Sequence, residues 1–368
     1  MKKVFTLLLV IAFFPCWALE AHAEDIYSQA ATEFGADKLE DTLSKEEKEI
    51  MGEMKLDGQY DAGGALSRLW RSFVAKLVSE IRANVSHFTA LVAICLIAAL
   101  CTSLTGSSTS TAFIELAGCG GAAILMLGSI DSIVSQTVEA MYRLSDYSKA
   151  ALPVIFTASA ASGAVTSAAA KFAAVSFALD VLMSISQRLI IPVIYAFLAM
   201  TLANSMFPNH ILSGVQRLCK WAAATMMTGM TLAFTTYIGM VGAIGSAVDT
   251  TAVKTARSFI SGTLPVVGGM ISDASAMVLS AAGVVKNCAG VFGLIAVCVM
   301  CSGPFALLSV KMLFLKAVSA ISDSMDGQRL SSLFTGLSNT MSLLLGLLGS
   351  CGIMLFISLT AGMKAVSI

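Results

Sequence analysis

The sequence predicts an all-α, polytopic helical membrane protein with about six to eight spans, and three observations support this. Of the 368 residues, 57% are hydrophobic and 12% are charged, whereas a soluble domain carries about 25% charged residues. The mean hydropathy is +0.83, and the apolar residues gather in runs long enough to cross a bilayer. One of these runs contains a proline, a glycine pair and two charges, which indicates broken or re-entrant segments inside the membrane domain.

Residues 1–23 are typical of a secretory signal peptide. Two lysines precede an apolar core, and Ala21-His22-Ala23 forms a cleavage site before Glu24. Ala21, Ala23 and Glu24 are therefore the predicted cleavage residues. The alternative is an uncleaved first span, which the short apolar core and Pro15 disfavour. Cleavage would place the mature N-terminus outside the cytoplasm.

Residues 24–87 form the expected extracytoplasmic part of the chain, which begins with an acidic arm. Twelve acids and four lysines fall within residues 24–61. Ser44 followed three residues later by Glu47 matches a capping box and predicts the start of a helix. The arm either docks a partner or is simply solvated.

A basic amphipathic helix is predicted for residues 64–87. Apolar residues recur at helical spacing from Leu66 to Ile81, with Trp70 as a candidate interfacial anchor. Basic residues lie between them, namely Arg68, Arg71, Lys76 and Arg82. A helix lying on the membrane and a helix that binds a partner are equally compatible with this pattern.

The membrane domain is predicted to occupy residues 88–368. Its apolar segments are 88–104, 112–134, 150–186, 189–207, 221–248, 259–286, 289–310 and 333–360. Polar joints are expected at 135–149, 208–220, 249–257 and 323–329. The alanine- and serine-rich segment 150–186 is either one weak span or a helical hairpin.

The least ordinary apolar segment runs from Leu264 to Gly290. It contains Pro265, Gly268 and Gly269, then Asp273, and finally Lys286-Asn287. Proline removes a backbone donor, and a charge at membrane depth costs about 2.5–3.5 kcal/mol. Protein or water must satisfy such groups, so we expect an interior element, with Asp273 able to pair with Lys286 across a hairpin. The alternative is a kinked packing helix with its charges at the interface.

The membrane domain also shows internal sequence similarity at a constant offset of 112 positions, which predicts possible repeats 135–246 and 247–358. The matching positions are Leu152-Pro153-Val154 with Leu264-Pro265-Val266, Pro192 with Pro304, Met200 with Met312, and Gln216-Arg217-Leu218 with Gln328-Arg329-Leu330. Repeats with broken segments in equivalent places point to a translocation site between them. Pro153 and Pro265 would then mark paired discontinuous elements.

The sequence contains no recognisable catalytic, cofactor-binding or metal-binding pattern, so no enzyme activity and no cofactor are expected. Zinc spacings, a nucleophile elbow and a phosphate-binding loop are all missing. The zero net charge and the absence of a basic stripe also give no case for nucleic acid as a partner. Cys298 and Cys301 have redox spacing, but they lie in an apolar run where cysteine is ordinarily a small buried hydrophobe.

Ionisable residues inside the apolar segments are the remaining functional candidates. Asp180 and Arg188 are eight positions apart, about two helical turns, so they would share a face. With Asp273 and Lys286 they complete the candidate set for a passage, although interior salt bridges that serve packing explain the same residues.

The layout of leader, acidic segment, basic amphipathic helix and polytopic region resembles the stage III sporulation protein AE family of endospore-forming bacteria. The most specific match is Leu264-Pro265-x-x-Gly268-Gly269-x-x-Ser272-Asp273, followed by Leu279 and by Lys286-Asn287-x-x-Gly290. The resemblance extends from the leader to Thr360. Val285 departs from it, because the family pattern has a leucine before the lysine.

The resemblance implies a multi-pass protein of the mother-cell membrane that surrounds the forespore. It implies membership of a channel or secretion apparatus that joins the two cells and is required for endospore formation. The implied partners are other stage III sporulation A-operon proteins, including a cytoplasmic ATPase and ring-forming proteins, and a forespore partner called Q. A gradient-driven secondary transporter and a membrane scaffold that recruits the ring proteins are the alternatives.

Overall fold

The computed structural model describes residues 39, 41–51, 62–105, 108–163, 165–207, 210–263 and 268–363. The predicted signal peptide, its cleavage residues Ala21, Ala23 and Glu24, and Pro265 lie outside this part of the chain. Its elements are α3 (Lys45–Met51), α4 (Ala62–Leu104), α5 (Ser108–Ala161), α6 (Val165–Ile185), a π-helical turn η1 (Ser186–Ile190), α7 (Ile191–Met206), α8 (His210–Thr263), α9 (Gly268–Ser324) and α10 (Gln328–Met363).

The all-α membrane class is confirmed, because the described residues form helices and turns without a strand. Five helices of this part are long and apolar enough to cross a membrane. They cover Ser67–Leu104, Ser110–Ala161, Ala168–Met206, Ala282–Ser324 and Gln328–Met363. The third combines α6, η1 and α7 into one span.

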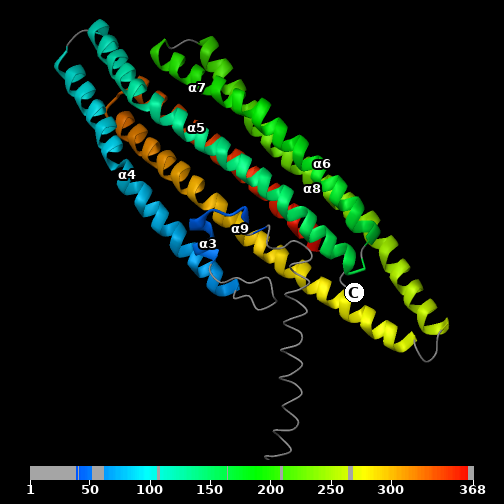
Figure 1. Ribbon diagram of the computed structural model, residues 1–368. Coiled ribbons are helices and arrows are strands. Elements are labelled where there is room, and N and C mark those ends of the chain that lie inside the picture. Colours follow the sequence, from blue (N-terminus) through cyan, green and yellow to red (C-terminus); the bar gives the residue numbers. More distant parts are fainter. Residues whose placement is uncertain are drawn as a thin grey trace, which may run out of the picture.

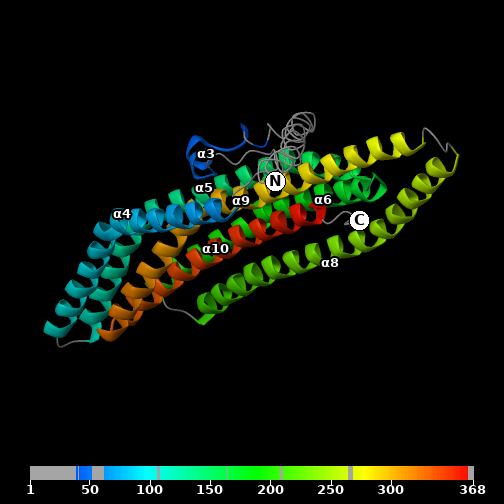
Figure 2. The ribbon, with the colours of Figure 1, turned by 90° about the horizontal axis from the view of Figure 1, so that it is seen from below.

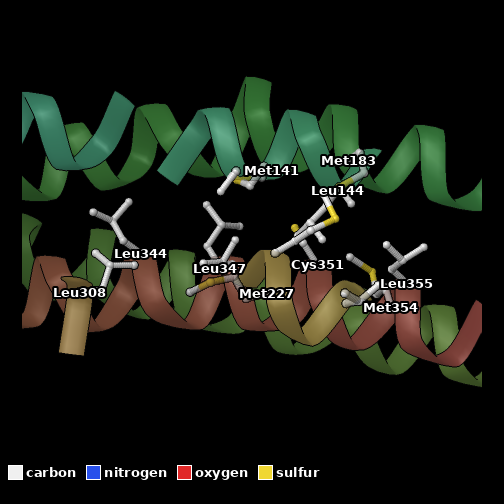
Figure 3. Packing of buried hydrophobic residues seen from close by; sticks show 14 of the residues in the cluster. Met141, Leu144, Met183, Met227, Leu308, Leu344, Leu347, Cys351, Met354 and Leu355 are labelled. Atoms are coloured by element: carbon white, nitrogen blue, oxygen red, sulfur yellow. The ribbon is translucent and has the colours of Figure 1, made fainter. Parts of the chain in front are cut away.

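The helices run side by side as an elongated bundle (Figure 1). α4, α5 and α9 pack together on one side, and α6, α7 and α8 on the other. α10 packs against α9, α5, α8 and α7, so it lies at the centre (Figure 2). Apolar side chains from α5, α6, α8, α9 and α10 fill this centre, among them Met141, Met183, Met227, Leu308 and Leu347 (Figure 3).

Two turns show why the chain reverses where it does. Gly163 has φ of 101°, a left-handed conformation that glycine adopts without a steric penalty and that commonly ends a helix. Its amide donates to the Ala160 carbonyl at 3.0 Å. This turn separates α5 from α6, which pack against each other, so the helical hairpin interpretation of 150–186 holds. The polar joint at 323–329 contains the turn between α9 and α10.

Two of the other predicted joints are wrong, and a third is right only at its start. Residues 135–149 lie inside α5 and residues 249–257 lie inside α8. The joint predicted at 208–220 begins between α7, which ends at Met206, and α8, which begins at His210, but its residues 210–220 lie inside α8. Residues 64–87 continue directly into the span of α4. These helical stretches are polar, but they contain no proline and little glycine, so nothing ends the helix there. The described part therefore carries the predicted apolar segments on longer helices, five of which are long and apolar enough to cross a membrane.

The predicted hairpin between Asp273 and Lys286 is also wrong. α9 runs without interruption from Gly268 to Ser324, and 13 residues of α-helix separate two backbones by about 20 Å. α5 likewise continues through Pro153, so that proline does not mark a broken element. The chain turns between α5 and α6, whereas the positions 112 residues later lie within the continuous helix α9. The internal duplication therefore stays a prediction from the sequence.

Candidate functional site: a charged seam between α4, α5 and α9

Ionisable and polar side chains line the contact between α4, α5 and α9 and continue to α3. We call this set the charged seam. It comprises Glu46, Glu47, Lys76, Glu80, Ser129, Gln136, Glu139, Arg143 and Lys311. Charges between apolar helices are costly unless they are paired or hydrated, so their arrangement is informative.

The α3 end of the charged seam is closed by ion pairs. A carboxylate oxygen of Glu47 lies 2.5 Å from Nη2 of Arg143, and the Glu47 side chain is 6% exposed. Glu46 lies 2.9 Å from Nζ of Lys76. The predicted capping box fixes the start of α3, since the Ser44 amide donates to Glu47 at 2.8 Å and the Glu47 amide donates to Ser44 Oγ at 3.3 Å. Glu47 therefore both caps α3 and attaches it to α5.

Lys311 forms the deep end of the charged seam. It is 8% exposed, and its Nζ donates to Ser129 Oγ on α5 at 3.1 Å. Glu80 on α4 is close enough to interact electrostatically with Lys311. The Glu80 carboxylate accepts a hydrogen bond from Asn84 Nδ2 at 3.1 Å. A buried lysine thus has a hydroxyl and a carboxylate as neighbours, which are the groups that make its charge tolerable.

Between these ends lies a polar cavity of about 320 Å³. Charged or amide side chains of α4 and α5 line it, with the proline of α9 on the opposite side; they are Lys76, Glu80, Gln136, Glu139, Arg143 and Pro304. Lys76 reaches α9 near Gly303. The cavity is wide enough to hold several water molecules, so the charged seam combines a polar middle that has room for water with a buried cationic end.

A second polar cluster lies where α5, α7 and α10 meet at one end of the bundle. Glu115 on α5 and Arg329 on α10 are 3.4 Å apart. Cavities of about 410 and 420 Å³ adjoin this ion pair, and Glu115 and Asp326 line both of them. The pair ties the start of α10 to α5.

The predicted candidates Asp180 and Arg188 are both exposed, and no ion pair joins them within the described residues. The π-helical turn η1 begins between them at Ser186. Their role in a passage stays a prediction. Pro153 is half-buried in α5, and Asn287 is exposed on α9.

Among the predicted charges whose burial the structure describes, Lys286 alone lies in the interior. It is buried beside Lys171 of α6, which is also buried, and the two charges interact. Gly268, Gly269 and Asp273 lie on the first turns of α9. Lys171 was not among the predicted candidates, because the sequence around a lone lysine in an alanine-rich run does not indicate which residues of other helices lie beside it.

Sequence reasoning also missed the charged seam, whose members fall in the acidic arm, the amphipathic helix, the stretch 112–149 and the position after the segment 289–310. One signal was present: Lys76 with Glu80 and Glu139 with Arg143 are each spaced by four residues, which places each pair on one helix face. The described residues contain no group of three or more histidine, cysteine or carboxylate side chains suited to a metal ion. Cys298 and Cys301 are free thiols.

Comparisons with known proteins give a consistent result. Residues 48–365 match the family described as stage III sporulation protein AE. A relative is the stage III sporulation protein AE of Bacillus subtilis (strain 168), which is 24% identical over 238 residues. That alignment covers 64% of this chain and 59% of the relative, so it spans less than two thirds of the relative's length. No solved structure matches the chain significantly.

Proposed function

This chain belongs to the stage III sporulation protein AE family, and from that membership we propose that it is a non-enzymatic component of the channel or secretion apparatus between mother cell and forespore. It would sit as a multi-pass protein in the mother-cell membrane around the forespore and form part of the membrane passage. Its partners would be other stage III sporulation A-operon proteins, including a cytoplasmic ATPase and ring-forming proteins, and the forespore partner Q.

The observation that carries the role in a passage is the charged seam. The centre of the bundle is packed with apolar side chains (Figure 3). The charged seam runs between peripheral helices and lines a polar cavity of about 320 Å³. Ionisable residues within membrane segments ordinarily face the protein interior or water. A passage bordered by the charged seam, and completed by other subunits, fits this arrangement.

Two other functions stay open as alternatives. A gradient-driven transporter is favoured by buried Lys311 with Glu80 beside it, because a buried charge pair can couple proton or ion binding to movement. A scaffold that recruits ring proteins is favoured by α3, which is anchored by its own ion pairs. Glu80→Gln and Lys311→Gln separate them: a transporter would lose function while it still assembles, and a scaffold would tolerate both changes.

Thiol accessibility in intact sporulating cells tests the proposal. Native cysteines are replaced, single cysteines are placed at Gln136 and Glu139, and a membrane-impermeant reagent is added. Ile124 on the same helix is 76% exposed and serves as the control position, because its apolar surroundings should be lipid. We expect labelling at 136 and 139 and none at 124. Equal absence of labelling at all three positions, in variants that still sporulate, would contradict a hydrated passage.

A further inference from the structure

The first half of α4 presents an apolar stripe that no other described element covers. Trp70, Val74, Val78, Ile81 and Val85 are all exposed, from 39% to 64%. At 100° per residue they fall within an arc of about 80°. Their spacing of four, four, three and four residues is that of a helix that packs along another helix.

An arginine edge borders this stripe on one side. Arg71 and Arg82 are exposed, and on the helical wheel they lie about 20° and 40° beyond Val78. Within the described residues neither takes part in an ion pair. The carboxylate of α4, Glu80, lies on the opposite side of the helix, where it binds Asn84 and faces Lys311. The exposed face is therefore apolar and cationic, without an acidic group of its own.

The length of α4 argues against lipid as the cover of this stripe. Ser67–Leu104 forms one helix of 38 residues, about 57 Å long, whereas the hydrocarbon core is about 30 Å thick. Placing all of it in the core would require a tilt near 60°, beyond the range of about 0–40° seen for membrane helices. Residues 88–104 are the uncharged part of α4 and fill about 26 Å of the core. The stripe then lies outside the core and needs a protein cover.

A second copy of this chain is a poor cover for the stripe. In an antiparallel pair of α4 helices the arginine edges would face each other. In a parallel pair they would face the opposite edge, which carries Phe73, Leu77 and Asn84 and no carboxylate. Like charges across an interface are unfavourable, and complementary charges select partners. The charge pattern calls for a carboxylate-bearing segment other than a second α4.

We propose that residues 70–85 of α4 form the docking site for an amphipathic helix of a different protein, which carries an apolar stripe and carboxylates along one edge. The partner's apolar residues would cover Val74, Val78 and Ile81, and its carboxylates would face Arg71 and Arg82. This proposal rests on the exposed face of α4 and does not depend on whether the charged seam borders a passage.

Photo-crosslinking from full-length protein in sporulating cells tests the docking site. The crosslinking amino acid p-benzoylphenylalanine replaces Val78 and, as the matched control, Ala83, which is exposed on α4 away from the stripe. We expect Val78 to give an adduct with another protein whose crosslinked peptide, mapped by mass spectrometry, is an acidic amphipathic helix. Arg71→Glu with Arg82→Glu should lower the yield of that adduct about tenfold, since two attractions become repulsions, and should leave the amount of protein unchanged.

Four other results would overturn the proposal. They are an adduct with phospholipid, an adduct with a second copy, an adduct within the same chain, and an adduct to a protein segment without carboxylates. Equal adduct yields from Val78 and Ala83 would also overturn it, because a partner docked on the stripe must crosslink more to Val78 than to Ala83. Thiol labelling of the charged seam can succeed or fail independently of each of these outcomes.

Discussion

α4 and α10 are similar in hydropathy and opposite in environment. In the most apolar 18-residue window of each helix, 17% of the residues of α4 are buried, against 56% in α10. α10 is enclosed by α5, α7, α8 and α9 (Figure 2), whereas α4 packs chiefly on α5 and α9 and leaves one face open. Hydropathy therefore identifies both as membrane helices but does not tell protein interior from periphery.

Close contacts at glycine are one difference between the two helices. Gly336 of α10 lies directly against Thr201 of α7, and Gly362 lies against Ile155 of α5, so close that an added Cβ would overlap either neighbour. Residues 88–104 of α4 contain no glycine. Close approach of helix backbones at small residues is the main source of packing energy inside membranes, where lipid is as apolar as leucine.

The largest expected effect comes from removing a large side chain from each helix in turn. Leu347→Ala in α10 deletes a fully buried side chain and should lower the free energy of unfolding by about 2–5 kcal/mol. Leu100→Ala in α4 deletes a side chain that is 63% exposed and should change it by less than about 0.5 kcal/mol. Unfolding in mixed micelles measures both. Equal losses would show that α4 is covered as completely as α10.

Two glycine substitutions, one in α10 and one in α5, test the same comparison with a smaller expected change in the free energy of unfolding. Gly336→Ala should cost about 1–3 kcal/mol of unfolding free energy, because the new methyl group overlaps Thr201 and the helices must separate. Gly120→Ala on α5 meets no atom within 4 Å and should be neutral or stabilising by up to about 1 kcal/mol. The same unfolding measurement applies. A neutral Gly336→Ala would mean that α7 and α10 are packed less closely than the structure has them.

The sequence was sufficient for the membrane class and for the cap at Ser44, because composition and local hydrogen bonding are properties of short segments. It did not decide between a single weak span and the hairpin between α5 and α6. It was not sufficient for the continuity of α5, α8 and α9. Polar stretches such as 135–149 look like loops, yet a polar stretch continues a helix when it packs on neighbours. The charged seam was missed because its pairs join residues far apart, such as Glu47 with Arg143.

The smallest expected effect concerns α3, which packs on α4 and α9 at one end of the charged seam. Glu47→Gln keeps a capping residue at the third helical position but removes the charge that faces Arg143. We expect α3 to detach from α5 more often. The free energy of this local opening should fall by only about 1 kcal/mol, because Arg143 is 40% exposed and water screens the ion pair. Hydrogen exchange of residues 45–51 in the full-length protein measures this opening.

Two companion variants show whether the ion pair or the cap holds α3 in place. Glu49→Gln removes an exposed carboxylate of the same helix and should leave the exchange rates unchanged. Arg143→Gln should raise them as much as Glu47→Gln does, and the double variant should add little, because both changes break one interaction. Fully additive effects would instead indicate that Glu47 and Arg143 act on α3 independently of each other, and α3 would then be attached to α4 by Glu46 and Lys76 rather than to α5.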